Sequence, residues 1–587
     1  MTRKICLFRT ILVAASALTP VAAAFAQGVP PAFPTREQVN PAVPVTEAPK
    51  NTVRVDSDAA FQSGPCPLAE TDIQTSIKEV RFTAPGGGAL APELLTLLTD
   101  VTTSTESQPI RVVCDLRDQA NARLRRARYV ASVQIPPQRI GDGVLRLEVV
   151  SGHIVEVHVR GDAGPYEGLL RSRIERLKEL TPLNAGDAER ILLLANDLPG
   201  MTVQLGLSPK TSGGVPGDLI GELSVTYRRF SLIGNVQNYN SAVLGRETGY
   251  LRAEFFGLTG MGDRTFVAGS TSFDFKEQRI AQLGHSMALG SAGTRLGVIG
   301  TLAFSRPSID LDLRTRSLIL NLEASRPLMR SLNRNAAVTL GFDYVQQRTR
   351  VHNSGSSFAF SSDTISTIYA RVGGDTRKLR FDGSQAHSLS AGLELRQGLG
   401  IFGATKTKTA VFGPDGGPSR FEGSAKATVV RGDVAGTIGF GPIFELAATG
   451  RGQWTNKPLL NYDEFAIGNL TMGRGYDPGA NTGDRMIGAS VEARANFGIS
   501  SKARAQIYGF YDGVKLWNLD TGSSERNRYL ASVGGGARLT LFNSIRLDVT
   551  YAHPLDPPLL TGVTVTRAPD RVMASLTAQI IPFGSRR

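Results

Sequence analysis

Apolar and polar side chains alternate with a period of two from about residue 228 to the end of the chain. The segments 388–396, 545–551 and 572–580 show this most clearly, because aliphatic residues occupy every second position in each of them. Such a period places one face of a β-strand against a dry environment and the other face against water. The last ~360 residues are therefore predicted to fold as amphipathic strands.

Both a soluble β-sandwich and a membrane barrel produce this alternation. The apolar faces here are small and aliphatic over many consecutive segments, and none of these segments is apolar on both faces. This favours the barrel. About 360 residues, at roughly ten per strand plus a turn or loop, predict an even-numbered barrel of around 16 antiparallel strands. Lipid cannot satisfy an open sheet edge, so the barrel is expected to be closed.

The amino-terminus has the order of a secretory signal peptide. Arg3, Lys4 and Arg9 precede an apolar run over residues 11–18, and the small residues Ala24 and Ala26 follow. This pattern predicts a signal peptide over residues 1–26, with cleavage after Ala26. A membrane anchor is the other interpretation, but the apolar run is short. No later stretch reaches the ~18 consecutive apolar residues that a membrane-spanning helix needs.

Two cysteines remain once the predicted signal peptide has removed Cys6. An even pair in an exported protein, here Cys66 and Cys114, predicts a disulfide. Two unpaired buried thiols are the alternative.

The region between the signal peptide and the barrel divides into three parts. Proline density over residues 27–65 predicts an extended linker. The periodicity then alternates between strand and helix, and predicts two consecutive β-α-α-β-β units at 66–150 and 151–227. Each unit is expected to form a mixed sheet covered by helices. The barrel is placed at 228–587.

Catalytic, metal and cofactor motifs are missing from this sequence. It has no His-Glu-x-x-His pattern, no phosphate-binding Gly-rich loop ending in Lys-Ser/Thr, and no Gly-x-Ser-x-Gly elbow. We therefore expect neither an enzyme nor a bound metal or cofactor. The net charge of +13 is spread along the chain. It fits a charged lumen and contact with anionic lipid better than a nucleic-acid surface.

The segment Met472-Gly473-Arg474-Gly475-Tyr476 interrupts the alternating strands. A guanidinium inside a lumen requires a carboxylate that it can bind with two nitrogens. Alternation places Asp512 on a lumen face, and it places Glu492 and Arg494 on another as secondary candidates. An ordinary glycine turn and an ordinary lumen carboxylate explain these residues equally well when they are taken alone.

In the order of these features the chain resembles the TpsB-type transporters of two-partner secretion. These are the haemolysin secretion/activation proteins, in the superfamily that joins POTRA domains to a barrel. Arg474-Gly475-Tyr476 matches the loop-six signature of the family, and Phe510-x-Asp512-Gly513 resembles the strand motif whose aspartate receives that arginine. The run Asn196-Asp197-Leu198-Pro199-Gly200 is similar to the second POTRA domain.

The resemblance implies α+β POTRA modules in the periplasm and an all-β barrel in the bacterial outer membrane. It implies translocation of a large unfolded exoprotein of the adhesin or haemolysin type, bound first through the POTRA domains. The cargo's identity and activation, a plug helix, the oligomeric state and the POTRA edge that binds cargo stay open. An assembly factor for outer-membrane proteins and a passive porin or receptor are the alternatives.

Overall fold

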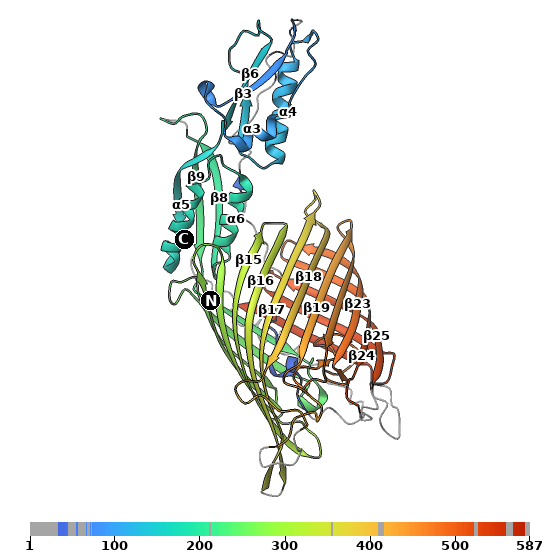
Figure 1. Ribbon diagram of the computed structural model, residues 1–587. Coiled ribbons are helices and arrows are strands. Elements are labelled where there is room, and N and C mark those ends of the chain that lie inside the picture. The colour runs from blue at the N-terminus through green and yellow to red at the C-terminus, as the bar shows by residue number, and fades with distance from the viewer. Residues whose placement is uncertain are drawn as a thin grey trace, which may run out of the picture.

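Two small α/β modules lead into one closed β-barrel (Figure 1). The computed structural model describes residues 33–44, 55–56, 66, 68, 71, 73–210, 213–353, 356–408, 416–521, 526–558 and 568–580. The predicted signal peptide lies outside the described residues. Among these residues, no helix is both long and apolar enough to span a bilayer.

The first module contains two helices packed on a three-stranded sheet. Its helices are α3 (Pro92–Leu98) and α4 (Val112–Arg126), and its strands are β3 (Glu79–Thr83), β5 (Ala131–Gln134) and β6 (Val144–Ser151), with the short pair β2 (Gln74–Thr75) and β4 (Gln108–Pro109) beside them. The sheet order is β3-β6-β5. Leu116, Ala120 and Leu124 recur at helical spacing on α4 and are buried against the strand residues Leu145 and Leu147.

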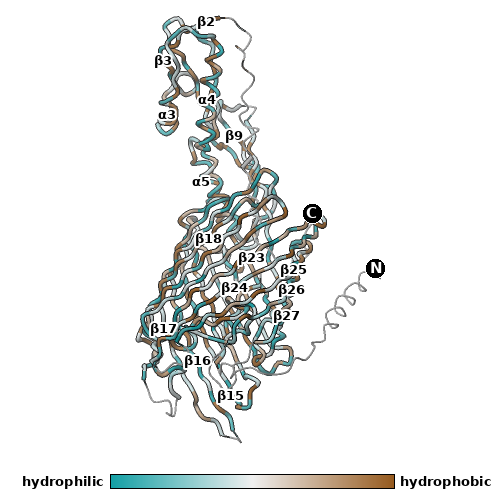
Figure 2. Tube along the Cα trace, turned by 90° about the vertical axis from the view of Figure 1, so that its right-hand side faces the viewer, coloured by the Kyte–Doolittle hydropathy of each residue, from teal (hydrophilic) through white to brown (hydrophobic). Residues whose placement is uncertain are grey.

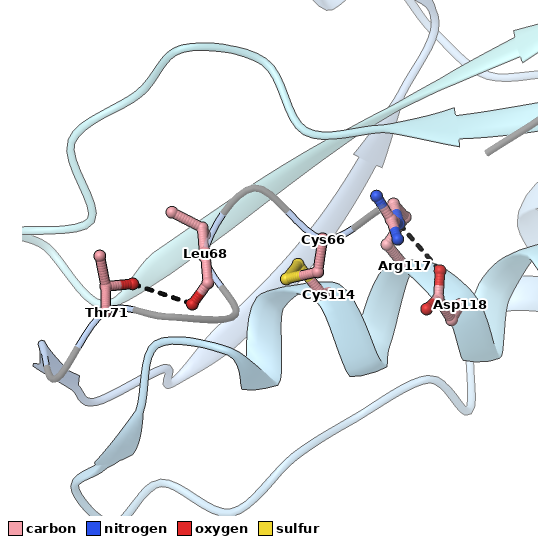
Figure 3. The surroundings of a disulfide bond; sticks show 6 residues. All are labelled: Cys66, Leu68, Thr71, Cys114, Arg117 and Asp118. Atoms are coloured by element: carbon pink, nitrogen blue, oxygen red, sulfur yellow. Dashed lines mark hydrogen bonds and ion pairs between the residues drawn. A yellow bond between two sulfur atoms is a disulfide. The ribbon is translucent and has the colours of Figure 1, made fainter. Parts of the chain in front are cut away.

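A disulfide fastens the segment before β2 to helix α4 (Figure 3). It joins Cys66 to Cys114, so the pairing expected from the sequence is present. A crosslink over this separation stabilises a module mainly by restricting its unfolded chain. It compensates for the small core of a sheet with only three strands.

The second module repeats the pattern with longer elements. It contains β7 (His153–Gly161), α5 (Glu167–Lys178), α6 (Ala185–Asn196), β8 (Met201–Pro209) and β9 (Asp218–Tyr227). Asn184 begins α6 by accepting a hydrogen bond from the Gly186 amide at 2.8 Å. The order β1-β8-β9-β7 includes a two-residue strand β1 (Val55–Asp56) from the preceding segment.

Sixteen antiparallel strands close the barrel, which confirms the predicted architecture. The last strand pairs with the first from Leu232↔Ile580 to Gln237↔Ser575, so the sheet has no edge. The strands are β10 (Phe230–Gln237), β11 (Thr248–Phe256), β12 (Arg264–Ser272), β13 (Gln278–Leu289), β14 (Thr294–Ser305), β15 (Asp312–Arg330), β16 (Arg334–Asn353), β17 (Ser356–Leu379), β18 (Gln385–Leu399), β19 (Thr428–Phe440), β20 (Phe444–Thr455), β23 (Arg485–Ser500), β24 (Ala503–Trp517), β25 (Asn527–Leu541), β26 (Ile545–Pro554) and β27 (Arg571–Ile580).

Burial alternates along these strands as the sequence predicts. On β24, Tyr508, Phe510 and Asp512 are buried, while Ile507 and Tyr511 are exposed on the outer surface. Hydrophilic and hydrophobic residues accordingly follow one another along the barrel strands in Figure 2. The polar face lines the lumen and the aliphatic face is turned to lipid.

The second module is docked on the turns at the near end of the barrel. The Tyr166 hydroxyl donates to the carbonyl oxygen of Asp263 at 3.0 Å. Arg330 binds both carboxylate oxygens of Asp197, at 2.7 and 2.9 Å. These contacts come from different barrel turns and fix the module against the rim. The opposite end of the barrel is called the far end below.

The predicted periplasmic linker over residues 27–65 is wrong for residues 33–44. These residues lie inside the barrel, where Arg36–Val39 form the one-turn helix α2, drawn in blue within the barrel outline in Figure 1. Val39 is fully buried in a cluster with inward residues of β13–β17, among them Ile280 and Ile319. The Gln38 amide donates to Asn240 at 3.1 Å and to Ser241 at 3.0 Å.

The sequence held a local signal for this helix. Thr35 and Gln38 cap each other reciprocally, through the Thr35 hydroxyl and the Gln38 side chain. Proline density concealed it, since the helix fits between Pro34 and Pro41 and is shorter than any periodicity test can detect.

Candidate functional site

The connection between β20 and β23 starts at the far end and folds back into the lumen. We call residues 456–484 the inward loop. It is held as a hairpin by two short antiparallel strands, β21 (Phe465–Ala466) and β22 (Thr482–Gly483). Its tip carries Gly473, Arg474, Gly475 and Tyr476, the residues singled out in the sequence.

Arg474 is bound to the barrel wall through both backbone and side chain. Its Nε lies 2.9 Å from Asp512 Oδ2 and its Nη2 lies 2.7 Å from Asp512 Oδ1. The Arg474 amide also donates to Asp512 Oδ2 at 3.0 Å. The guanidinium stacks on Phe510, with its central carbon 3.5 Å from the ring centroid. Asp512 lies on β24, and its side chain is only 2% exposed.

Glu492 on β23 joins Arg474 to two further arginines. It accepts from Arg474 Nη1 at 2.5 Å, from Arg494 Nε at 2.6 Å and from Arg538 Nη1 at 3.1 Å. Glu492 and Arg494 are therefore brought to the same cluster as Arg474. Arg538, on β25, was not predicted from the sequence, although its position on a polar lumen face is an available signal.

The two residues that follow Arg474 also contact the barrel wall. The Gly475 amide donates to Ser532 Oγ at 3.2 Å. Tyr476 is completely buried, and its hydroxyl lies 2.8 Å from the carbonyl oxygen of Ala531. Gly473 has φ +93°, a conformation that non-glycine residues rarely adopt. The tip therefore requires glycine before the arginine for its backbone, and Tyr476, two positions later, is buried among apolar residues with its hydroxyl bound to the barrel.

Asp477 ties the inward loop to the seam where the barrel closes. Arg246, in the connection from β10 to β11, binds its two oxygens at 2.7 and 3.2 Å. Arg571 on the last strand contributes a second ion pair at 3.0 Å. Sequence reasoning missed these three residues. Neighbouring members of this set are more than 90 positions apart in the sequence, and no spacing rule connects them.

The base of the inward loop is fastened separately. Asp484 is fully buried and accepts from Arg420 at 2.5 and 3.2 Å. Glu464 forms a further ion pair with the same guanidinium at 2.9 Å. Between base and tip, Leu460 and Tyr462 pack in the cluster that contains Val39 of α2. The loop and the short helix thus pack against each other inside the lumen.

These groups hold the tip of the inward loop against the barrel wall. The cluster consists of guanidinium, carboxylate and aromatic side chains in mutual contact, without an activated nucleophile. Within the described part of the chain, no three His, Cys, Asp or Glu side chains gather in a way that would hold a metal ion. The contacts of Arg474 with Asp512 and Glu492 join the tip of the inward loop to the barrel wall.

The barrel and the modules agree with comparisons to known proteins. A family model described as haemolysin secretion/activation protein ShlB/FhaC/HecB matches residues 224–539, more than half of the chain. The chain belongs to this family. It is accordingly an outer-membrane transporter of two-partner secretion, which translocates an exoprotein partner and has its POTRA domains in the periplasm. The assembly-factor and passive-porin alternatives gain no support from this membership.

Individual relatives are distant. The heme/hemopexin transporter protein HuxB of Haemophilus influenzae is 22% identical over 447 residues, covering 73% of this chain and 74% of HuxB. The solved structure of CdiB from Escherichia coli superposes with a TM-score of 0.69 at 15% identity, covering 88% of this chain and 93% of CdiB. CdiB from Acinetobacter baumannii gives a TM-score of 0.59 at 15% identity, over 93% and 95% of the two chains. These structures share the fold of the family member described here.

Gly475→Ala is expected to prevent the loop tip from docking. A Cβ at this position would lie 2.7 Å from Ser532 Cβ and 3.0 Å from the Pro554 nitrogen, so backbone would have to shift. Overpacking of this kind costs about 1–3 kcal/mol. We expect reduced export at unchanged barrel abundance, measured by immunoblots of medium and outer-membrane fractions. Gly498→Ala, on β23 with free space around it and without a positive φ, is the control, since it adds the same methyl group to the barrel without a clash. Equal export by both variants would contradict the steric argument.

Proposed function

We propose that residues 66–150 and 151–227 act as two POTRA domains that capture an extended segment of the exoprotein in the periplasm. The captured segment then enters a charged lumen while Arg474 holds the inward loop against Asp512 and Glu492. The cargo is proposed to bind as an added β-strand, using main-chain hydrogen bonds for affinity and side-chain pockets for specificity. The edge we assign to it is β8.

The observation that carries this proposal is that β8 pairs with β1, a short strand from outside the second module. Val55 and Asp56 lie parallel to β8, opposite Leu205 and Gly206. An edge that accepts one extended segment has backbone donors and acceptors in position for another. β8 lies in the second module, and its inward residues share a core cluster with Ala288 of the barrel strand β13, so a strand added there lies in the module that is docked on the barrel.

Part of the same edge is closed. The Val203 amide donates to Asn196 Oδ1 at 2.6 Å, and the Val203 carbonyl accepts from Asn196 Nδ2 at 3.3 Å. The backbone N–H and C=O groups of odd-numbered β8 residues therefore point away from β9, toward the free side of the sheet. Those of Val203 are already hydrogen-bonded to Asn196. This restricts the proposed cargo strand to the stretch around Leu205 and Leu207, where it would take the place of residues 55–56.

No nucleotide-binding loop is present in the sequence, so the work of translocation must come from elsewhere. We assign it to folding of the exoprotein outside the cell, which removes the exported segment from the translocation equilibrium. The locked loop keeps the lumen walls in one arrangement during this passage.

Site-specific photo-crosslinking in the full chain tests the edge assignment. A photoreactive residue at Gln204 or Ser208, both exposed on β8, is expected to crosslink to the exoprotein during export. The same residue at Arg171, exposed on α5, is the matched control and should not crosslink. Crosslinks from β7 or β5 in place of β8 would move the cargo to another edge. Export without crosslinks from any module position would refute capture by the modules.

A further inference from the structure

The outer surface of the barrel carries four arginines in a two-by-two array. Arg314 and Arg316 on β15 stand directly opposite Arg350 and Arg348 on β16. We call these four residues the arginine patch. Side chains in such register have Cβ atoms about 5 Å apart, and like charges placed there repel each other.

All four side chains face away from the lumen. Their strand neighbours Thr315, Ser317 and Thr349 are each 1% exposed and point inward, while the four arginines are exposed. The outward face would therefore hold four repelling guanidinium groups at one level of the barrel.

The protein itself neutralises little of this charge. Asp312 binds Arg314 at 2.8 Å but is shared with Arg306 at the same distance. Arg316 lies over the Phe304 ring at 5.7 Å, and Arg350 donates to Ser357 Oγ at 2.8 Å, neither of which supplies negative charge. Among the described residues, neither Arg316 nor Arg348 forms an ion pair. An external anion is needed to relieve the repulsion.

The position of the patch relative to the bilayer identifies where that anion lies. Along β15 the outward residues after Arg316 are Leu318, Leu320 and Leu322, and the next outward arginine is Arg326. Ten residues at ~3.3 Å each and a tilt of about 45° span roughly 23 Å along the membrane normal. This is close to the ~25 Å apolar band of an outer-membrane barrel. Arg316 and Arg326 therefore mark its two borders.

The patch belongs to the outer leaflet. β10, the first barrel strand, begins beside the second module. The first, third and every second strand after it in the barrel order therefore run toward the far end, and the strands between them run back. β15 is the sixth strand and starts at the far end with Asp312. Since the modules are periplasmic, the arginine patch lies on the extracellular side, at the level of the lipid headgroups.

We propose that the arginine patch binds the phosphate groups of a phosphorylated glycolipid in the outer leaflet. Guanidinium groups bind phosphate oxygens with two parallel hydrogen bonds, and two facing pairs can hold a headgroup with two phosphates. The acyl chains of the lipid lie along the outward leucines below, including Leu320 and Leu340, which are 44% and 58% exposed. Bound lipid anchors this side of the barrel where the strands of the β15–β17 wall extend beyond the membrane.

Binding of diphosphoryl lipid A to the purified full chain tests the proposal without any export assay. The chain is placed in nanodiscs of phosphatidylcholine, lipid A is titrated in, and native mass spectrometry counts the retained molecules. The test variant carries Arg314→Gln, Arg316→Gln, Arg348→Gln and Arg350→Gln together. We expect its apparent affinity to fall by roughly tenfold or more relative to the unaltered chain. The matched control Arg326→Gln, at the other membrane border, should bind normally.

Lipid A without phosphates should bind weakly to every variant. Equal retention of lipid A by the fourfold variant would overturn the proposal, and so would equal binding of the dephosphorylated lipid. Complete displacement by inorganic phosphate would assign the patch to a soluble anion and overturn its assignment to lipid. Heat-modified migration on gels verifies that each barrel is folded. If the fourfold variant fails this check, the pair Arg316→Gln and Arg348→Gln replaces it, with the same criteria.

Discussion

Arg474→Ala is expected to abolish most export of the exoprotein while the barrel remains in the outer membrane at near-normal abundance. The substitution leaves Asp512 almost fully buried without its guanidinium partner. Breaking one side of a buried ion pair costs about 3–5 kcal/mol. This is enough to release the loop tip, since each ~1.4 kcal/mol changes the docked population tenfold. The backbone ladders that close the barrel do not involve Arg474 and should persist.

Asp512→Ala should reduce export to a similar extent, and the double variant should lose no more than either single one. The two residues act as a unit, because Asp512→Ala removes the carboxylate that Arg474→Ala leaves without its partner. The measurement is the ratio of exoprotein in medium to exoprotein in periplasm, with barrel abundance followed in parallel. Arg474→Lys is the matched control. It retains the charge but loses the two-nitrogen contact, and should export at an intermediate level. Additive losses in the double variant would mean that the pair is not a functional unit.

Val39→Asp is expected to release helix α2 from the lumen and to increase ion conduction through the barrel. Val39 is fully buried in the cluster that anchors α2 among the inward residues of the barrel. An unpaired carboxylate in this apolar cluster costs several kcal/mol, so the docked population of the helix should fall by roughly 100-fold or more. We expect a larger and more frequent channel conductance in planar bilayers and greater sensitivity of cells to large antibiotics.

Val43→Asp is the matched control for the substitution at Val39. Val43 lies four residues further along the same segment and is 38% exposed, so a carboxylate there remains hydrated. Its conductance should equal that of the unaltered chain. Closed channels in the Val39→Asp variant would indicate that the inward loop alone blocks the lumen, through its fastening by Asp484 and Asp477.

The fold could be predicted from local patterns of apolar and polar residues. Helix α4 falls within the first predicted β-α-α-β-β unit, because its apolar positions recur at helical spacing along one short segment. The faces of β24 were predicted for the same reason, since alternation depends only on the boundary between lipid and lumen. The short helix α2 escaped this reasoning, because a single turn has no period and is stabilised by contacts with distant barrel residues.

The sequence by itself therefore determined the barrel, its approximate strand number, the two modules before it and the lumen faces that carry Arg474's candidate partners. These follow from periodicity, which each segment expresses independently of the others. Tertiary structure alone decided that Glu492 is shared by three arginines, that Asp477 joins the loop to the barrel seam, and that residues 33–44 enter the lumen. Closure of the barrel brings together residues hundreds of positions apart, and the pairing of charges then depends on distances in space that no local pattern encodes.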